Sequence, residues 1–241
     1  LLEKVPYVIL AIIFGVIGLI GKASVIATIT PWQTLLLSVK AIVFYLQKLF
    51  VPTKLSVLYP YTKSIELPSP DFFVPLLIVI ALIAVAISTL KWTKEIAFGL
   101  IFFFLTLAPT FMNFAKAGDV YVASDRYAYI PSIGLLFLIA MLFHRLTAKR
   151  SQLMQAAIAV FVVFFAFQAH AQSLTWRNTE SLFTNVLKHY PNSHIAHNNL
   201  GSLLFNRKEY RSAYQHYRDS IAIRPNGMAY YNLGQFFTEM N

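Results

Sequence analysis

The sequence predicts an all-α protein in which a bundle of about six membrane-spanning helices, residues 1–170, is followed by short helical hairpins, residues 171–241. Hydrophobic residues make up 57% of the chain and charged residues only 12%, whereas soluble domains contain about 25% charged residues. After residue 175 the composition becomes that of a soluble helical segment, and its pattern returns after about 33 residues. These observations separate a membrane part from a repeat part.

Each membrane span is predicted by a long apolar segment that ends at charged or proline-rich residues. The second segment carries Gln33, Lys40 and Gln47, which recur every seven residues and share one helical face. Such a polar stripe faces the interior of a bundle, or the helix lies flat at the membrane surface; we favour a spanning helix. The predicted spans are Val5–Ile20, Gln33–Phe50, Phe72–Leu90, Ile96–Phe111, Tyr129–Leu146 and Leu153–Ala169.

The net charge of +10 lies mainly in the membrane part, where it sets orientation and attracts anionic membrane lipid rather than nucleic acid. The densest basic segment, His144–Arg150, predicts a cytoplasmic connection. Alternation of the spans then places Val51–Asp71, the central stretch Asp119–Gly134 and the repeats outside the cytoplasm. The chain has no cysteine, which excludes disulfides, thiolate metal sites and cysteine nucleophiles.

The segment His194–Asn226 has the residue spacing of a tetratricopeptide repeat. Small residues let two antiparallel helices approach, aromatic side chains fill the space between them, and a proline ends the hairpin. The pattern returns at Ala229–Gly234, and Trp176–Pro191 fits the second helix of a preceding unit. About three units are usually needed for stability, so we expect the chain to be part of a longer protein with more repeats. The predicted repeat core is Leu200, Gly201, Tyr210, Ala213, Tyr217 and Pro225.

The central stretch is polar and rich in tyrosine although it lies between two apolar segments. Ionisable residues at the end of a membrane span are costly to bury without partners, and they therefore indicate a site. The alternative is a solvated loop in which Arg126 pairs with Asp125 and the tyrosines lie in the membrane interface. The candidate residues for binding a substrate or a phosphate are Asp119, Asp125, Arg126, Tyr127, Tyr129 and, from the second span, Lys40.

The sequence predicts no cofactor and no metal site. His194 and His197 lie three residues apart on a repeat helix but have no further matched ligands, and a role on the repeat surface is commoner. A glycine-rich phosphate loop and the HExxH and GxSxG motifs are absent from the sequence.

Three segments, Ser124–Gly134, Trp176–Phe183 and Asn198–Gly201, resemble the transmembrane and tetratricopeptide-repeat family of O-mannosyltransferases. The order of basic turn, last span and repeats is also similar. The resemblance implies a C-type glycosyltransferase that moves a sugar from a polyprenyl phosphate to an acceptor outside the cytoplasm. The membrane would be the bacterial cytoplasmic membrane or the endoplasmic reticulum. Family members carry a presumed catalytic acidic residue in an N-terminal half, which is expected upstream of this chain.

Two classes of function follow. In an enzyme, Arg126 would grip the phosphate of the lipid-linked donor, because a guanidinium binds phosphate oxygens in pairs, and Asp125 or Asp119 would orient the donor or the acceptor. The alternative is a non-catalytic, membrane-anchored scaffold whose repeat surface binds a protein or peptide partner. A transporter is a weaker third hypothesis that rests only on the stripe of Gln33, Lys40 and Gln47.

Overall fold

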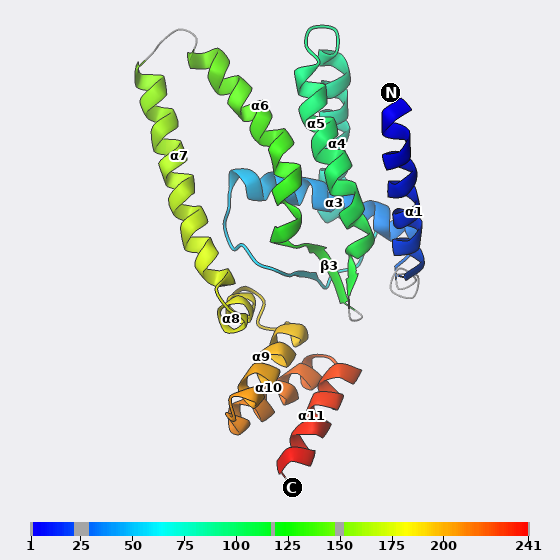
Figure 1. Cartoon of the computed structure of the whole chain (residues 1–241), viewed down its shortest axis with the longest axis vertical. Coiled ribbons are helices and arrows are strands. Elements are labelled where there is room, and N and C mark those ends of the chain that lie inside the picture. The colour runs from blue at the N-terminus through cyan, green and yellow to red at the C-terminus, as the bar shows by residue number, and fades with distance from the viewer. Residues whose placement is uncertain (1, 22–28, 117–118, 148–151, 241) are drawn as a thin grey trace.

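The computed structural model describes residues 2–21, 29–116, 119–147 and 152–240, and it confirms the all-α fold class. Long apolar helices run between the two ends of the membrane part, while short helices form a separate group beyond it (Figure 1). The long helices are α4 (Pro70–Thr89), α5 (Glu95–Leu107), α6 (Tyr129–Thr147) and α7 (Gln152–Ser173).

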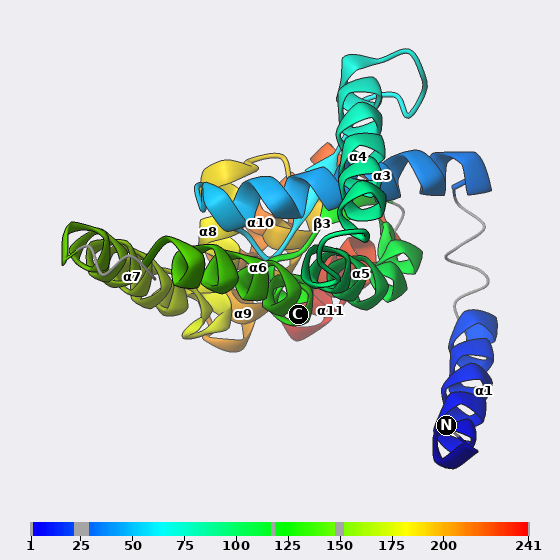
Figure 2. The same ribbon diagram turned by 90° about the horizontal axis from the view of Figure 1, so that it is seen from above.

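Five described helical segments are long and apolar enough to cross a membrane, compared with the six or so spans that the sequence predicts. Helix α1 (Val5–Gly21) is apolar but has only 17 residues, and it stands apart from the other helices (Figure 2). In the predicted basic connection His144–Arg150, residues 148–150 lie outside the described residues. The five segments are Pro31–Phe50, Pro70–Thr89, Glu95–Asn113, Tyr129–Leu146 and Gln152–Trp176.

Helix α3 (Pro31–Phe50) runs across the ends of the long helices instead of alongside them (Figure 1). Its polar stripe has local partners. Gln33 forms a capping box with Thr30 at the start of the helix, and the Nζ atom of Lys40 lies 3.5 Å from a carboxylate oxygen of Asp71. Gln47 is exposed. This crossing orientation favours the alternative in which α3 lies along the membrane surface. The sequence could not decide between the two, because length and hydropathy are the same for a lying and a spanning helix.

A small antiparallel sheet, which the sequence analysis did not foresee, lies beside α3. It contains β1 (Tyr59–Tyr61), β2 (Ala115–Lys116) and β3 (Asp119–Ala123), with β3 in the centre. The first five residues of the central stretch are therefore a strand. Strands of two to five residues are too short to show the alternation of apolar and polar side chains that predicts a sheet.

Helices α5 and α6 approach each other at two glycines. A Cβ atom at Gly134 would lie 2.4 Å from the carbonyl oxygen of Gly99, and one at Gly99 would lie 2.5 Å from the side chain of Leu138. Small residues of this kind let membrane helices pack backbone to backbone. The contact holds the N-terminal end of α6, which follows the central stretch, against the buried residues Leu100 and Phe103 of α5.

The described residues of the repeat part form four α-helices. These are α8 (Thr179–His189), α9 (His194–Asn206), α10 (Tyr210–Ile223) and α11 (Gly227–Met240). Helices α9 and α10 form a hairpin, and the predicted domain boundary at residues 170–171 lies within α7. Among the residues of the predicted repeat core, Leu200, Gly201, Ala213 and Tyr217 are buried, Tyr210 is half-buried, and Pro225 is exposed after the end of α10.

We expect Gly201→Leu to destabilise the repeat hairpin. A Cβ atom at Gly201 would lie 2.8 Å from the ring of Tyr217, so a larger side chain must push α9 away from α10 at a cost of about 1–3 kcal/mol. Gly234→Leu is the matched control, because Gly234 has the equivalent place in the next repeat and nothing lies within 4 Å of its Cβ position. Thermal unfolding measures both variants. Equal melting temperatures would show that the repeat frame is wrong.

Candidate functional site

A cavity of about 490 Å³ lies where the C-terminal end of α3, the start of α6 and the C-terminal end of α7 meet. Most of its wall is apolar, and its polar groups come from α3, from the central stretch and from the C-terminal end of α7. A pocket with a few polar groups on an apolar wall is the usual form of a ligand-binding site. The polar and aromatic residues that line it include Lys48, Asp125, Tyr129, Ser132, Gln172 and Trp176.

Asp125 is the acidic residue of this cavity. It lies in the short 3₁₀ turn Asp125–Tyr127, between β3 and α6. The hydroxyl of Tyr59 donates a 2.5 Å hydrogen bond to its Oδ1 atom. The other oxygen, Oδ2, is buried and has no hydrogen-bond partner among the described residues. Burial raises the pKa of this carboxyl from 3.8 to about 6, although Tyr59 and Lys48 oppose the shift.

The turn that carries Asp125 is held in place by α3. The hydroxyl of Tyr45 donates to the carbonyl oxygen of Ser124 at 3.1 Å and accepts from the Ser124 backbone N–H at 3.0 Å. Tyr59 stays a donor to Asp125, because burial and the neighbouring carboxylate raise the pKa of its hydroxyl. These hydrogen bonds fix the position of the Asp125 carboxylate. At neutral pH this carboxylate can accept a hydrogen bond or a proton from a hydroxyl group in the cavity.

Lys48 supplies a positive charge to the same cavity. Its Nζ atom donates a 2.5 Å hydrogen bond to the carbonyl oxygen of Thr53, and it lies 5.2 Å and 5.6 Å from the ring centres of Phe44 and Tyr59. These contacts fix the ammonium group near the wall. The sequence did not point to Lys48. It is merely the second lysine on the helix of Lys40, and Asp125, which shares the cavity with it, lies far along the chain.

The structure separates Arg126 from Asp125. The guanidinium is exposed, lies 5.1 Å from the ring centre of Tyr127, and lines a different, small cavity of about 30 Å³ together with that tyrosine. In the described part of the chain, no ion pair joins Arg126 to Asp125. Tyr129, by contrast, lines the larger cavity with Asp125. The predicted candidates therefore divide into two groups that point to different spaces.

Two further candidates are occupied by partners within the protein. Asp119 accepts a hydrogen bond from Arg224, and its Oδ2 atom lies 2.6 Å from Nε2 of His194 in an ion-pair contact. The hydroxyl of Tyr121 also donates to Oδ2, at 3.2 Å. Asp119 thus joins β3 to the repeat helices. Lys40 pairs with Asp71, as described above, and does not line the cavity.

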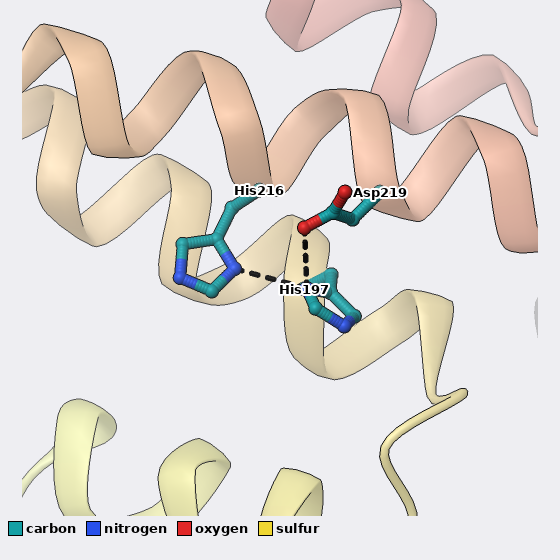
Figure 3. A group of neighbouring side chains, drawn as sticks. All are labelled: His197, His216 and Asp219. Carbon is teal, nitrogen blue, oxygen red and sulfur yellow. Dashed lines mark hydrogen bonds and ion pairs between the residues drawn. The ribbon is translucent and has the colours of Figure 1, made fainter.

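Side chains with the spacing of metal ligands lie on the repeat hairpin and not in the cavity. Among the described residues they are His197, His216 and Asp219 (Figure 3). The sequence showed only His194 and His197 as neighbours. In the structure His194 turns towards Asp119, and the second histidine of the group comes from α10.

No protein-family profile and no solved structure matches this chain. Among curated proteins, the protein O-mannosyl-transferase Tmtc3 of Drosophila melanogaster is 27% identical over 125 residues, which are 50% of this chain and 14% of that protein. Human TMTC3 is 22% identical over 152 residues, which are 62% of this chain and 16% of the relative. Xenopus laevis tmtc2 is 30% identical over 132 residues, 51% of this chain and 16% of the relative.

The chain spans about a sixth of the length of the curated relatives that it matches. All three relatives are protein O-mannosyl-transferases by name, and their family has the combination of membrane helices and helical repeats that is seen here. The homologues of this chain are therefore protein O-mannosyl-transferases of the transmembrane and tetratricopeptide-repeat family, the family that its sequence motifs indicated.

Proposed function

We propose that this chain is part of a membrane-bound protein O-mannosyl-transferase and that the cavity beside Asp125 receives the lipid-linked sugar donor. The observation that carries the proposal is Asp125, which lines a 490 Å³ cavity and whose buried Oδ2 atom has no partner in the described structure. A buried carboxylate oxygen without a hydrogen bond is costly. A ligand hydroxyl that fills the cavity would remove this cost.

The two charged residues of the cavity suit different parts of a polyprenyl-phosphate mannose donor. An ammonium group has three N–H donors, and the carbonyl of Thr53 takes one of those of Lys48. The others are available to phosphate oxygens. Asp125 would repel the phosphate and instead accepts a hydrogen bond from a hydroxyl of the sugar or of the acceptor. The polyprenyl chain would lie along the exposed apolar surfaces of α6 and α7.

We also propose an orientation in the membrane. Lys91 and Lys94 lie in the α4–α5 connection, and Arg145 lies at the same end of the bundle, where it pairs with Glu95 at 2.6 Å. Positive residues favour the cytoplasmic side. The cavity, the sheet and the repeat helices lie at the opposite end (Figure 1). This end would face away from the cytoplasm, on the side where the family resemblance places the acceptor.

One observation favours an additional binding role for the repeats. Helix α11 exposes several large apolar side chains to solvent. A repeat surface of this kind buries its apolar side chains against a neighbouring repeat or a protein partner. A protein partner held there would be an acceptor in the enzyme or a ligand in a non-catalytic scaffold. The exposed side chains are Met228, Tyr230, Tyr231 and Phe237.

Lys48→Gln and Asp125→Asn should each reduce mannose transfer from polyprenyl-phosphate mannose at least tenfold. Hydrogen bonds to charged groups contribute about 1.5–3 kcal/mol, which corresponds to a factor of about 10–100. Transfer in membranes containing the whole protein is the measurement. Lys54→Gln, which removes an exposed cation outside the cavity, is the control and should change little.

Arg126→Gln is the comparison that separates the two phosphate-binding hypotheses. A greater loss of donor use in Arg126→Gln than in Lys48→Gln would contradict the assignment to the large cavity and support the sequence-based assignment to Arg126. Normal transfer in both Lys48→Gln and Asp125→Asn would remove the cavity from the reaction.

The ionisation of Asp125 should make the folded state less stable as pH rises. Its pKa is about 6 in the folded protein, compared with an unperturbed value of 3.8. Between pH 3.8 and about pH 6 the carboxyl is therefore protonated in the folded state but has lost its proton in the unfolded state. Stability therefore falls from about pH 4 to pH 6, by at most about 3 kcal/mol. Asp125→Asn removes this loss. Relative to the parent, its melting temperature should rise between about pH 4 and pH 6 and keep that difference at higher pH. A difference between the two proteins that does not change with pH would contradict the pKa shift.

Lys91→Cys and Asn192→Cys should report opposite sides of the membrane. Both residues are exposed, and the chain has no other cysteine that could react. In sealed vesicles of known orientation, a membrane-impermeant maleimide should label position 192 from the extracytoplasmic side and position 91 only after permeabilisation. Labelling of both positions from one side would overturn the proposed orientation.

A further inference from the structure

Two histidines and one aspartate face each other across the repeat hairpin. His197 lies on α9, and His216 and Asp219 lie on α10 (Figure 3). Residues three apart share one face of a helix, so His216 and Asp219 point in the same direction. The packing of α9 against α10 brings His197 opposite to them. None of the three lines the cavity beside Asp125.

The distances in this group suit a single metal ion. The Nδ1 atoms of His197 and His216 are 2.9 Å apart, and Nδ1 of His197 is 3.8 Å from Oδ2 of Asp219. Metal–nitrogen bonds of about 2.0–2.1 Å separate two neighbouring ligands by about 2.9 Å at a right angle and by about 3.3 Å at the tetrahedral angle. To bind Zn²⁺ tetrahedrally, the two Nδ1 atoms would have to move apart by a few tenths of an ångström. For an ion with square or octahedral geometry they would hardly have to move.

The outer atoms of two of the three ligands already have partners. Nε2 of His197 lies 3.1 Å from the carbonyl oxygen of Pro191, so the ring proton belongs on Nε2 and the lone pair of Nδ1 points into the group. The amide of Gln215 donates a 2.8 Å hydrogen bond to Oδ1 of Asp219 and leaves Oδ2 for the group. Carbonyl and amide partners of this kind orient the ligands of metal sites in proteins.

The charge and the accessibility of the group also suit a cation. The two Nδ1 atoms face each other at 2.9 Å, so a metal ion can take the place of a proton shared between them. Asp219 supplies the single negative charge. The side chain of His197 is 14% exposed and that of Asp219 38% exposed, so an ion can reach the group from solvent.

We propose that His197, His216 and Asp219 bind a divalent transition-metal ion, with Zn²⁺ as the physiological candidate. Three protein ligands leave at least one coordination position for water or for a side chain of a bound protein. The ion would connect α9 to α10 and stiffen the hairpin. This site is independent of the proposed transferase activity, because it lies on the repeats and shares no residue with the cavity.

The test uses the untagged full chain in detergent, because a histidine tag would bind the same ions. Calorimetric titration with Zn²⁺ should show one bound ion per chain, and saturation should raise the melting temperature. His216→Gln and Asp219→Asn should each weaken binding at least tenfold and remove the thermal effect. His189→Gln is the matched control, since His189 belongs to the adjacent helix α8 but not to the group. It should bind like the parent.

A spectroscopic measurement on the parent protein keeps the proposal falsifiable even if a variant fails to fold. Co²⁺ bound by two imidazoles and a carboxylate should give visible d–d absorption that Zn²⁺ abolishes at one equivalent. Absence of this band, or equal Zn²⁺ affinity in the parent and a folded His197→Gln, His216→Gln double variant, would overturn the assignment. Circular dichroism of the variants establishes that the hairpin is still helical.

Discussion

The carboxylate of Asp119 connects the membrane part of this protein to its repeats. Arg224 donates to one of its oxygens and His194 lies against the other, so a strand next to the membrane helices is bound to both helices of the repeat hairpin. The contact is supported by apolar packing of Val57, Leu58 and Tyr121 against Val186 and Ala196. The bond from Arg224 is a hydrogen bond to a charged group, a type that contributes about 1.5–3 kcal/mol. The position of the repeats relative to the cavity depends on these contacts of Asp119.

The sixteen or so residues that begin at Asp119 serve three structural roles in succession. Strand β3 contacts the repeats through Asp119, the turn at Asp125 supplies the carboxylate of the cavity, and Gly134 brings α6 into contact with α5. Tyr45 fixes the turn through Ser124. A shift at any one of these points moves the others, because the segment between them is short and held at both ends. The carboxyl of Asp125 is thus positioned by contacts to the repeats on one side of the turn and to α5 on the other.

Local patterns predicted most of the fold. The apolar segments and the repeat spacing around Gly201 and Tyr217 could be identified because their periodicity is contained in neighbouring residues. The orientation of α3 could not, since hydropathy does not distinguish a lying helix from a spanning one. Of the candidate site, Asp125 and Tyr129 line the cavity. Lys48 and His216 were missed because their partners are brought to them by tertiary contacts from distant parts of the chain.

Helix α7 has no buried residue, and it diverges from α6 towards the repeats (Figure 1). Among the described residues, most of its apolar surface is left open to acyl chains. The tilt of such a helix responds to the thickness of the surrounding bilayer, at a cost of fractions of a kcal/mol per ångström of mismatch. Since Phe165, Gln168 and Gln172 on α7 form one wall of the cavity, the width of the cavity becomes a property of the host membrane as well as of the protein.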